Sequence, residues 1–198
     1  NKAYGSEIST QLQNVHPVSI PADAEVIGSE AQSYNVEIHR AIPQLEGHYA
    51  FDLLKLKGDS WLLDMGNRTL IATKVSRIGR IYKRKYFGGV GVRGLAERIC
   101  AREALAAEFR EHSPERVIDF LLDTKHGDDI AQAIVPDVSA CIAEALAFID
   151  DDSKRYLIGG GAAIPGLSAA LNATCPRNAQ WLNIEALAAS ADQILEVA

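Results

Sequence analysis

Leu62-Leu63-Asp64-Met65-Gly66-Asn67-Arg68-Thr69-Leu70-Ile71 joins an apolar run to a second β-prone run through a tight turn. This pattern predicts two strands, Ser60–Met65 and Thr69–Ser76, connected by Gly66-Asn67-Arg68. The turn places backbone amides and a glycine where a strand ends. Phosphate groups can approach a chain closely at such a point, so the turn is a candidate anion-binding loop.

A second segment of the same kind lies near the C-terminus. Tyr156-Leu157-Ile158-Gly159-Gly160-Gly161-Ala162 is an apolar run that breaks into three glycines before a helical stretch. The run predicts a short buried strand, Arg155–Ile158. Three glycines remove every Cβ where the chain turns, so a flat adenine or a ribose could lie against the backbone. The alternative is a flexible connection between a strand and a helix.

The remaining pattern predicts a mixed α/β chain. A third strand, Arg80–Phe87, follows the turn Arg77-Ile78-Gly79 and completes an antiparallel meander. Apolar spacing predicts further strands at Val15–Ile20 and Asn35–Ile42. It predicts helices at Gly47–Leu56, Val92–Glu111, Pro114–Leu122, Ile130–Ile149 (interrupted at Pro136), Pro165–Asn172 and Ala186–Val197.

The residue types of the first turn suit a magnesium nucleotide. Asp64 could hold Mg²⁺ through water, while the amides of Gly66 to Thr69 and the Thr69 hydroxyl could meet the β- and γ-phosphates. A DxGxxT pattern is short and common. An ordinary hairpin turn with a solvated aspartate is therefore the competing interpretation.

Gly89-Val90-Gly91-Val92-Arg93-Gly94 matches the GxGxxG pattern of dinucleotide-binding proteins, but its context does not. The preceding Lys83–Phe87 is too charged for a central parallel strand, and no βαβ unit surrounds it. We expect these glycines to let the meander enter the following helix. That helix would bring Arg93, Glu97 or Arg98 toward the ribose and base.

Two charged clusters could indicate nucleic-acid or metal binding, but a solvated surface is the simpler interpretation of each. The basic cluster comprises Arg77, Arg80, Lys83, Arg84 and Lys85. It is typical of a solvated strand pair, although nucleic acid or an acidic patch of a neighbouring subunit could contact it. Asp150-Asp151-Asp152 is expected to be a solvated loop rather than a metal cluster.

Composition excludes several classes. A net charge of −6 and a pI near 5.4 argue against a general nucleic-acid coat, and no stretch approaches about 18 consecutive apolar residues. No membrane partner is therefore expected. The five histidines have no zinc-ligand spacing, so a zinc site is not expected either. Three cysteines without CxxC spacing suit a reducing cytoplasm. The chain begins at Asn1, and its only methionine is Met65, so we expect it to be part of a longer protein.

From about Val36 to Ala189 the chain resembles the C-terminal part of plasmid-segregation actins of the ParM/StbA type. Leu63–Thr69 resembles that family's phosphate loop, and Leu95-Ala96-Glu97-Arg98-Ile99 its nucleotide-facing helix. Ile158–Ala162 and Trp181–Leu187 resemble its adenosine loop and connecting segment. The implied fold is α/β: a ribonuclease-H-like half of an actin-like ATPase, with a mixed sheet and flanking helices.

The resemblance implies a domain division and a set of binding residues. Residues 1–58 would be a partial segment of the first actin-like domain, and residues 59–198 the second, nucleotide-binding domain. ATP or GTP would bind with Mg²⁺, which Asp64 would hold through water. The candidate binding residues are Asp64, Gly66, Asn67, Arg68, Thr69, Glu97, Gly159, Gly160, Gly161 and Ala162. Members of the family polymerise into filaments, hydrolyse nucleotide and move plasmid copies apart through an adaptor–DNA complex.

Three departures from the family weaken the expected activity. No first phosphate loop precedes Asp64, Asn67-Arg68 replaces a more usual glycine-rich pair, and Ala186 stands where the connecting segment usually has glycine. A chain lacking one side of the nucleotide cleft should bind ATP weakly and hydrolyse it poorly. Two alternatives therefore stay open: a non-enzymatic actin-like scaffold or filament-capping module, and a small-molecule kinase of the same superfold.

Overall fold

The structure, a computed structural model, describes residues 15–20, 32–37, 50–102, 113–122 and 127–196. The chain divides into two units, residues 1–44 and residues 45–198. In the first unit, β1 (Val15–Ile20) pairs antiparallel with β2 (Gln32–Glu37). The strand expected at Val15–Ile20 is confirmed, whereas most of the second expected strand lies outside the described residues. The assignment of residues 1–58 to a first actin-like domain stays a prediction.

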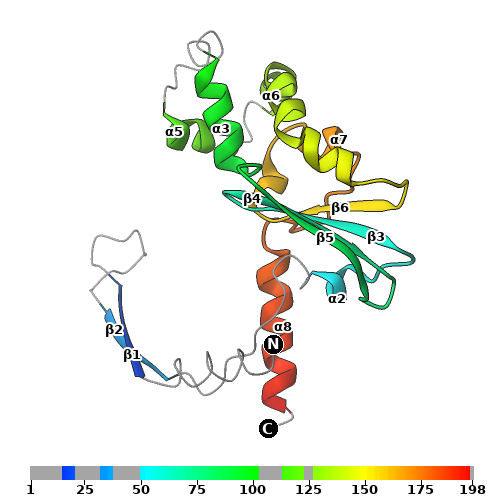
Figure 1. Cartoon of the computed structure of the whole chain (residues 1–198). Coiled ribbons are helices and arrows are strands. Elements are labelled where there is room, and N and C mark those ends of the chain that lie inside the picture. The colour runs from blue at the N-terminus through cyan, green and yellow to red at the C-terminus, as the bar shows by residue number, and fades with distance from the viewer. Residues whose placement is uncertain (1–14, 21–31, 38–49, 103–112, 123–126, 197–198) are drawn as a thin grey trace. The chain divides into compact units, whose positions relative to one another are not determined.

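The second unit is built on a four-stranded mixed sheet. Its strands are β3 (Ser60–Met65), β4 (Thr69–Val75), β5 (Ile81–Gly88) and β6 (Lys154–Ile158), in the order β5-β4-β3-β6 (Figure 1). The pairs β3–β4 and β4–β5 are antiparallel, whereas β3–β6 is parallel. The predicted meander and the predicted mixed sheet are therefore confirmed.

Helices cover both faces of this sheet (Figure 1). On one face lie α3 (Val92–Ala101), α5 (Pro114–Leu122), α6 (Gly127–Phe148) and α7 (Leu167–Ala170). They enclose the main core, to which β3 contributes Trp61, Leu63 and Met65. On the other face, α2 (Phe51–Leu54) and the start of α8 (Leu182–Glu196) cover Leu62 and Ile158. Burial on both faces explains why β3 reads as a continuous apolar run.

The prediction of an interruption at Pro136 is wrong, because α6 runs unbroken from Gly127 to Phe148. Proline removes one helical N–H and normally bends or breaks a helix. Here Pro136 is on the exposed side, and the buried Ile134 and Val138 flank it in the core. Burial of these side chains holds the helix together on either side of the proline.

Helix α6 is also long and apolar enough, between Ala131 and Phe148, to cross a membrane by length and composition alone. One face of this helix packs in the main core, however. Ile134, Ile142 and Ala145 are fully or almost fully buried in the main core. On its exposed side, Glu144 forms an ion pair with Lys85 of β5 at 2.7 Å.

The other helix boundaries differ modestly from those predicted. Helix α5 matches its prediction, and α8 begins at Leu182, four residues before the predicted start at Ala186. A 3-10 turn, η2 (Gly160–Ala163), precedes the short α7, where a longer helix was predicted. The second half of the helix predicted after Val92 lies outside the described residues.

Candidate nucleotide-binding site

The two loops singled out in the sequence meet at the carboxyl ends of β3 and β6. Asp64 pairs in register with Ile158, the last residue of β6, so Gly159 follows directly beside Asp64. Asp64 is only 7% exposed, and its Oδ2 accepts a hydrogen bond from Nδ2 of Asn183 at 2.9 Å. Three distant segments therefore converge where parallel strands end, the usual place for a ligand in an open α/β sheet.

Two of the three consecutive glycines are required by packing. A Cβ on Gly159 would lie 2.4 Å from Oδ1 of Asp64, and the φ of Gly159 is +85°. A Cβ on Gly161 would lie 2.6 Å from the Met65 side chain. Gly160 differs, because no atom lies within 4 Å of its Cβ position. Gly160 is thus the glycine with an open side that a ligand could cover.

The turn between β3 and β4 is bonded to the start of α3. The Gly66 N–H donates to the Thr69 carbonyl at 2.9 Å, so this amide is already engaged within the turn. The Gly66 and Asn67 carbonyls accept hydrogen bonds from the N–H groups of Val92 and Arg93 at 3.1 and 2.8 Å. These two N–H groups are among those that a helix start leaves without internal partners.

Close approach between this turn and the entry to α3 explains two further glycines. A Cβ on Gly91 would lie 2.4 Å from the Asn67 carbonyl oxygen, and one on Gly94 would lie 1.9 Å from the Gly89 carbonyl oxygen. Neither position has room for a side chain. The expectation that these glycines let the meander enter the helix is therefore confirmed, and β5 is an antiparallel edge strand rather than part of a βαβ unit.

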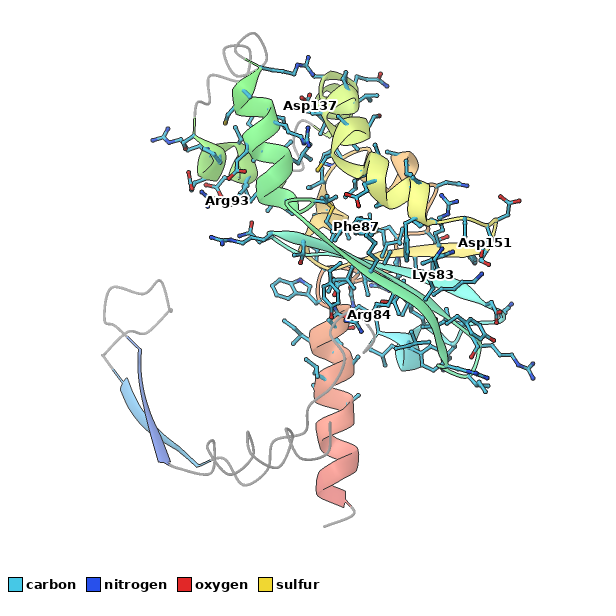
Figure 2. All side chains as sticks on the ribbon, in the orientation of Figure 1. Lys83, Arg84, Phe87, Arg93, Asp137 and Asp151 are labelled. Carbon is cyan, nitrogen blue, oxygen red and sulfur yellow. The ribbon has the colours of Figure 1, made fainter. Side chains whose placement is uncertain are left out.

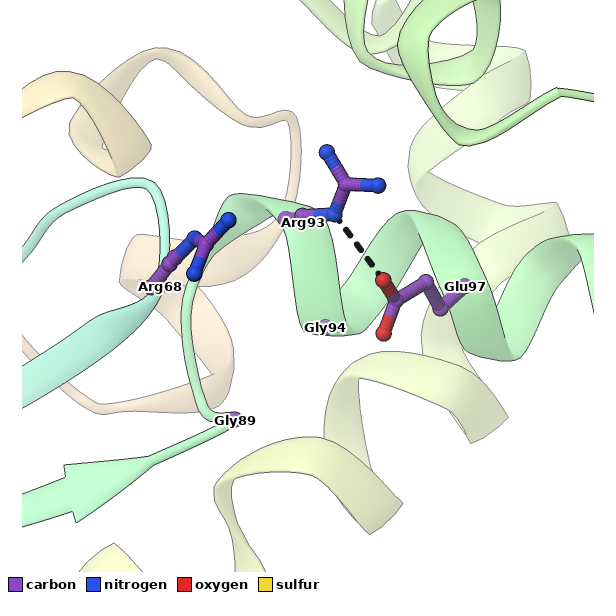
Figure 3. A pocket seen from close by; sticks show the side chains of 5 residues that line it. All are labelled: Arg68, Gly89, Arg93, Gly94 and Glu97. Carbon is purple, nitrogen blue, oxygen red and sulfur yellow. Dashed lines mark hydrogen bonds and ion pairs between the residues drawn. The ribbon is translucent and has the colours of Figure 1, made fainter.

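A pocket of about 300 Å³ opens between this turn and α3 (Figure 3). Its lining residues are Arg68, Gly89, Arg93, Gly94 and Glu97. A volume of this size is at the lower end of the range for small-molecule sites. The structure therefore places Arg68 and Glu97, two of the predicted binding residues, in one pocket. The other predicted residues are not among those that line it.

Charged side chains surround the pocket. Arg93 pairs with Glu97 of its own helix, Nε to Oε1 at 3.0 Å, and with Glu115 of α5, Nη2 to Oε1 at 3.2 Å. Sequence reasoning did not single out Glu115, and no local pattern marks it. Asn183 was also missed as a partner of Asp64, although it lies in the segment identified as the connecting segment.

One residue of the basic cluster pairs with the acidic cluster, and a second acidic residue is held by Lys74, which lies outside the basic cluster. Lys83 binds Asp150 at 2.8 Å, and Asp151 accepts hydrogen bonds from Lys74 and from the indole Nε1 of Trp61 (Figure 2). Lys74 and the other donors hold the pKa of Asp151 well below its usual range. The acidic loop is thus bonded to strands β3, β4 and β5 of the sheet. In the described part of the chain, no group of three or more His, Cys, Asp or Glu residues could hold a metal ion.

No protein-family model and no curated protein sequence matches the chain. Solved structures match in fold. The actin-like protein Alp7A superimposes with a TM-score of 0.67 at 14% identity, over 98% of this chain and 63% of its own. A non-polymerisable mutant of pCBH ParM gives 0.62 at 14% identity, over 97% and 65%. The archaeal actin homologue Ta0583 in complex with ADP gives 0.61 at 14% identity, over 83% and 61%.

These similarities establish the fold class. The chain has a partial ribonuclease-H-like actin fold, in which a mixed four-stranded sheet carries flanking helices. It spans less than two thirds of the length of each of these three proteins. At such low identity the comparison concerns the fold, and function must be argued from the site.

Proposed function

We propose that this chain is the nucleotide-binding part of an actin-like protein of the ParM type, which binds ATP with Mg²⁺ and assembles into filaments. In the complete protein these filaments would move plasmid or other DNA copies apart in the cytoplasm through an adaptor–DNA complex. The observation that carries the proposal is that the Asp64–Gly159 contact and the β3–β4 turn, which contributes Arg68 to the pocket, lie at the same end of the sheet.

The residues present suit a nucleotide. The Arg68 guanidinium suits an anionic group, and the Glu97 carboxylate can accept hydrogen bonds from hydroxyl or amino groups. A Cβ at Gly89, which lines the pocket, would meet no atom within 4 Å, so this part of the wall is bare backbone that a flat group could cover. A bound magnesium nucleotide would supply a γ-phosphate that water can attack.

The role of Asp64 in this proposal is to orient rather than to ligate directly. Its carboxylate is buried, accepts the Asn183 amide and packs against Gly159. A buried carboxylate held in this way can position a magnesium-bound water without leaving its place in the fold. It also ties the end of β3 to α8 through the hydrogen bond from Asn183.

One observation favours the scaffold alternative. The Gly66 amide and the carbonyls of Gly66 and Asn67 make hydrogen bonds within the protein, and Arg93 is paired with two carboxylates. A loop with these groups already engaged can be stable without a ligand. A degenerate actin-like module that caps or supports filaments would need no more than this.

Calorimetric titration with Mg–ATP tests the proposal. We expect millimolar or tighter binding to the wild-type chain and weaker binding to Asp64→Asn, which keeps an acceptor for Asn183 while removing the charge. Thermal unfolding of both proteins without ligand checks that each is folded. Repeated with Mg–ATP, it gives a second measure of binding, since a ligand that binds only the native state must raise the Tm. Absence of any heat or Tm change at 10 mM Mg–ATP would favour the scaffold function instead.

A further inference from the structure

Strand β5 is an edge of the four-stranded sheet. It stands first in the order β5-β4-β3-β6, and β4 is the only strand that pairs with it in the described part of the chain (Figure 1). In an antiparallel pair, alternate residues of an edge strand direct their N–H and C=O groups away from the partner. The outer edge of β5 therefore has the backbone groups that a further strand would need.

Two lysines lie on the face of β5 that is turned toward the main core. The Lys83 Nζ lies 2.8 Å from the Asp150 carboxylate, and the Lys85 Nζ lies 2.7 Å from the Glu144 carboxylate. Both lysine side chains stay more than a third exposed, at 37% and 43%. Because an ammonium group has three donors, each lysine can hold its present carboxylate and still donate to a second one.

Exposed aromatic rings lie beside arginines along the same strand. Tyr82 and Tyr86 are each 52% exposed. The guanidinium carbon of Arg80 lies 5.9 Å from the centroid of the Tyr82 ring, and that of Arg84 lies 4.9 Å from the Tyr86 ring. Arg80 and the nearby Arg77 are exposed, and neither forms an ion pair with a carboxylate that the structure describes. The edge thus combines apolar surface with positive charge.

This positive charge limits the kind of strand that can add to the edge. Edge strands are commonly protected from unwanted pairing by lysines and by bulges, and β5 has both, with an irregular register beside Lys74 and Val75 of β4. A second copy of β5 would bring cations against cations, which disfavours pairing of the strand with itself. A strand that carries carboxylates would meet opposite charges instead.

Nucleic acid suits this edge less well than an acidic strand. Binding to a phosphate backbone depends on several uncompensated cations, whereas carboxylates already balance the charges of Lys83 and Lys85. The chain has a net charge of −6, which opposes the approach of any anion. An acidic strand can offset this repulsion through backbone hydrogen bonds to β5, and a nucleic acid cannot form that ladder.

We propose that the outer edge of β5 binds an extended acidic segment of a partner protein, which adds to the sheet as a fifth strand. Backbone hydrogen bonds supply the pairing. Carboxylates of the segment contact Arg80 and the two lysines, and its apolar side chains cover the exposed tyrosine rings. The proposal does not rest on nucleotide binding, because no residue of β5 is among those that line the candidate pocket.

The experiment titrates the full chain with a synthetic peptide that alternates glutamate and valine over eight residues, the length of β5. NMR spectra of the isotope-labelled protein locate the contact and give the affinity. We expect the largest amide shifts at residues 82–87. The same peptide N-methylated at two adjacent central residues should bind at least about tenfold more weakly, because strand pairing needs its N–H groups. A peptide with lysine in place of glutamate should not bind.

Arg80→Glu tests the contribution of charge without disturbing the turn. The Arg80 N–H donates to the Ser76 hydroxyl at 3.0 Å, and its carbonyl accepts the Ser76 N–H at 2.9 Å, so the backbone is held independently of the side chain. Affinity for the acidic peptide should fall about threefold to tenfold, as for an exposed ion pair replaced by like charges. Arg116→Glu, the same change at an exposed position of α5, is the matched control and should leave the affinity unchanged.

Four outcomes would overturn the proposal. One is the absence of shifts at residues 82–87 with millimolar acidic peptide, and another is equal affinity for the methylated and unmethylated peptides. The third is tighter binding of oligothymidylate than of the acidic peptide in the same buffer, which would make the edge a nucleic-acid surface. The last is self-association of the wild-type chain that Arg80→Glu abolishes in sedimentation experiments, which would make a second copy the occupant.

Discussion

Asp64 and Asn183, 119 positions apart in sequence, are joined by a hydrogen bond of 2.9 Å from the amide Nδ2 to the carboxylate Oδ2. The bond links the end of the central strand β3 to the first turn of α8. Because Asp64 also packs against Gly159, it is the point at which the turn, the glycine loop and the C-terminal helix meet. A perturbation here should therefore be felt in both the stability and the ligand affinity of the unit.

Asn183→Ala removes one donor from the buried Asp64 carboxylate. We expect the free energy of unfolding to fall by about 1.5 to 3 kcal/mol, the range for a hydrogen bond to a charged group. Urea denaturation at pH 7 measures it. The control is Gln180→Ala, an exposed amide three residues earlier, which should change stability by less than about 0.5 kcal/mol. Equal effects of the two variants would show that Asp64 does not depend on Asn183.

Gly159→Ala and Gly160→Ala should differ strongly in their effect on stability although the two glycines are neighbours. Alanine at 159 would combine a positive φ with a Cβ only 2.4 Å from Asp64 Oδ1, and we expect a loss of roughly 2 to 5 kcal/mol. Alanine at 160 meets no atom within 4 Å and should leave stability nearly unchanged. If nucleotide lies on Gly160, that variant should still weaken ADP binding. Thermal unfolding with and without ADP separates the two effects, and a stable Gly159→Ala protein would contradict the packing argument.

The β3–β4 hairpin could be predicted from sequence because its signals are local. An apolar run ends at Met65, a turn containing Gly66 follows, and a β-prone run begins at Thr69, so strand type and boundaries agree with the structure. The antiparallel meander followed from the short connections, whereas the parallel pairing of β6 with β3 was not predicted. The continuity of α6 could not be predicted, since it depends on what Ile134 and Val138 bury beside Pro136.

The contact between two residues of the candidate site could be predicted from sequence, but the packing and ion pairs around it could not. The resemblance placed Asp64 and Gly159 in one cleft, and the structure brings them into contact. No sequence pattern shows that neighbouring atoms fill the Cβ positions of Gly159 and Gly161, whereas the Cβ position of Gly160 is open. The pairing of Arg93 with Glu115 is likewise tertiary, because it depends on how α5 packs against α3.

Asp151 should contribute to the loss of the protein's folding stability at acid pH. Its pKa is lowered from an ordinary value of 3.8, chiefly by the hydrogen bond from Lys74. A carboxyl with a lower pKa in the folded state stabilises the fold above its unfolded pKa, and this stability is lost as pH falls below that value. We therefore expect the wild-type protein to lose stability between about pH 5 and pH 2. Asp151→Asn should lack this part of the loss, so the free energies of unfolding of the variant and the wild type should approach each other at low pH.

A second variant separates the charge of Asp151 from its role as an acceptor. Asp151→Asn should cost about 1 kcal/mol or less at pH 7, because the Lys74 pair is partly exposed to solvent. Asp151→Ala should cost about 1 to 3 kcal/mol more, since the fully buried Trp61 would lose its indole partner. Urea denaturation at pH 7 and pH 3 measures both. A gap between wild type and Asp151→Asn that stays constant with pH would contradict the linkage.

Arg102 and Asp137 provide a test of how α3 is held to α6. The Asp137 carboxylate is only 5% exposed and binds the guanidinium of Arg102, whose side chain is 45% exposed. Arg102→Ala would leave a buried carboxylate without this partner, and we expect a loss of about 2 to 4 kcal/mol in the free energy of unfolding. Asp137→Asn in the Arg102→Ala background should recover part of the loss, because the buried charge is removed. Arg116→Ala, an exposed arginine on α5, is the control and should be nearly neutral. If the double variant is no more stable than Arg102→Ala, the loss comes from arginine packing rather than from the unpaired charge.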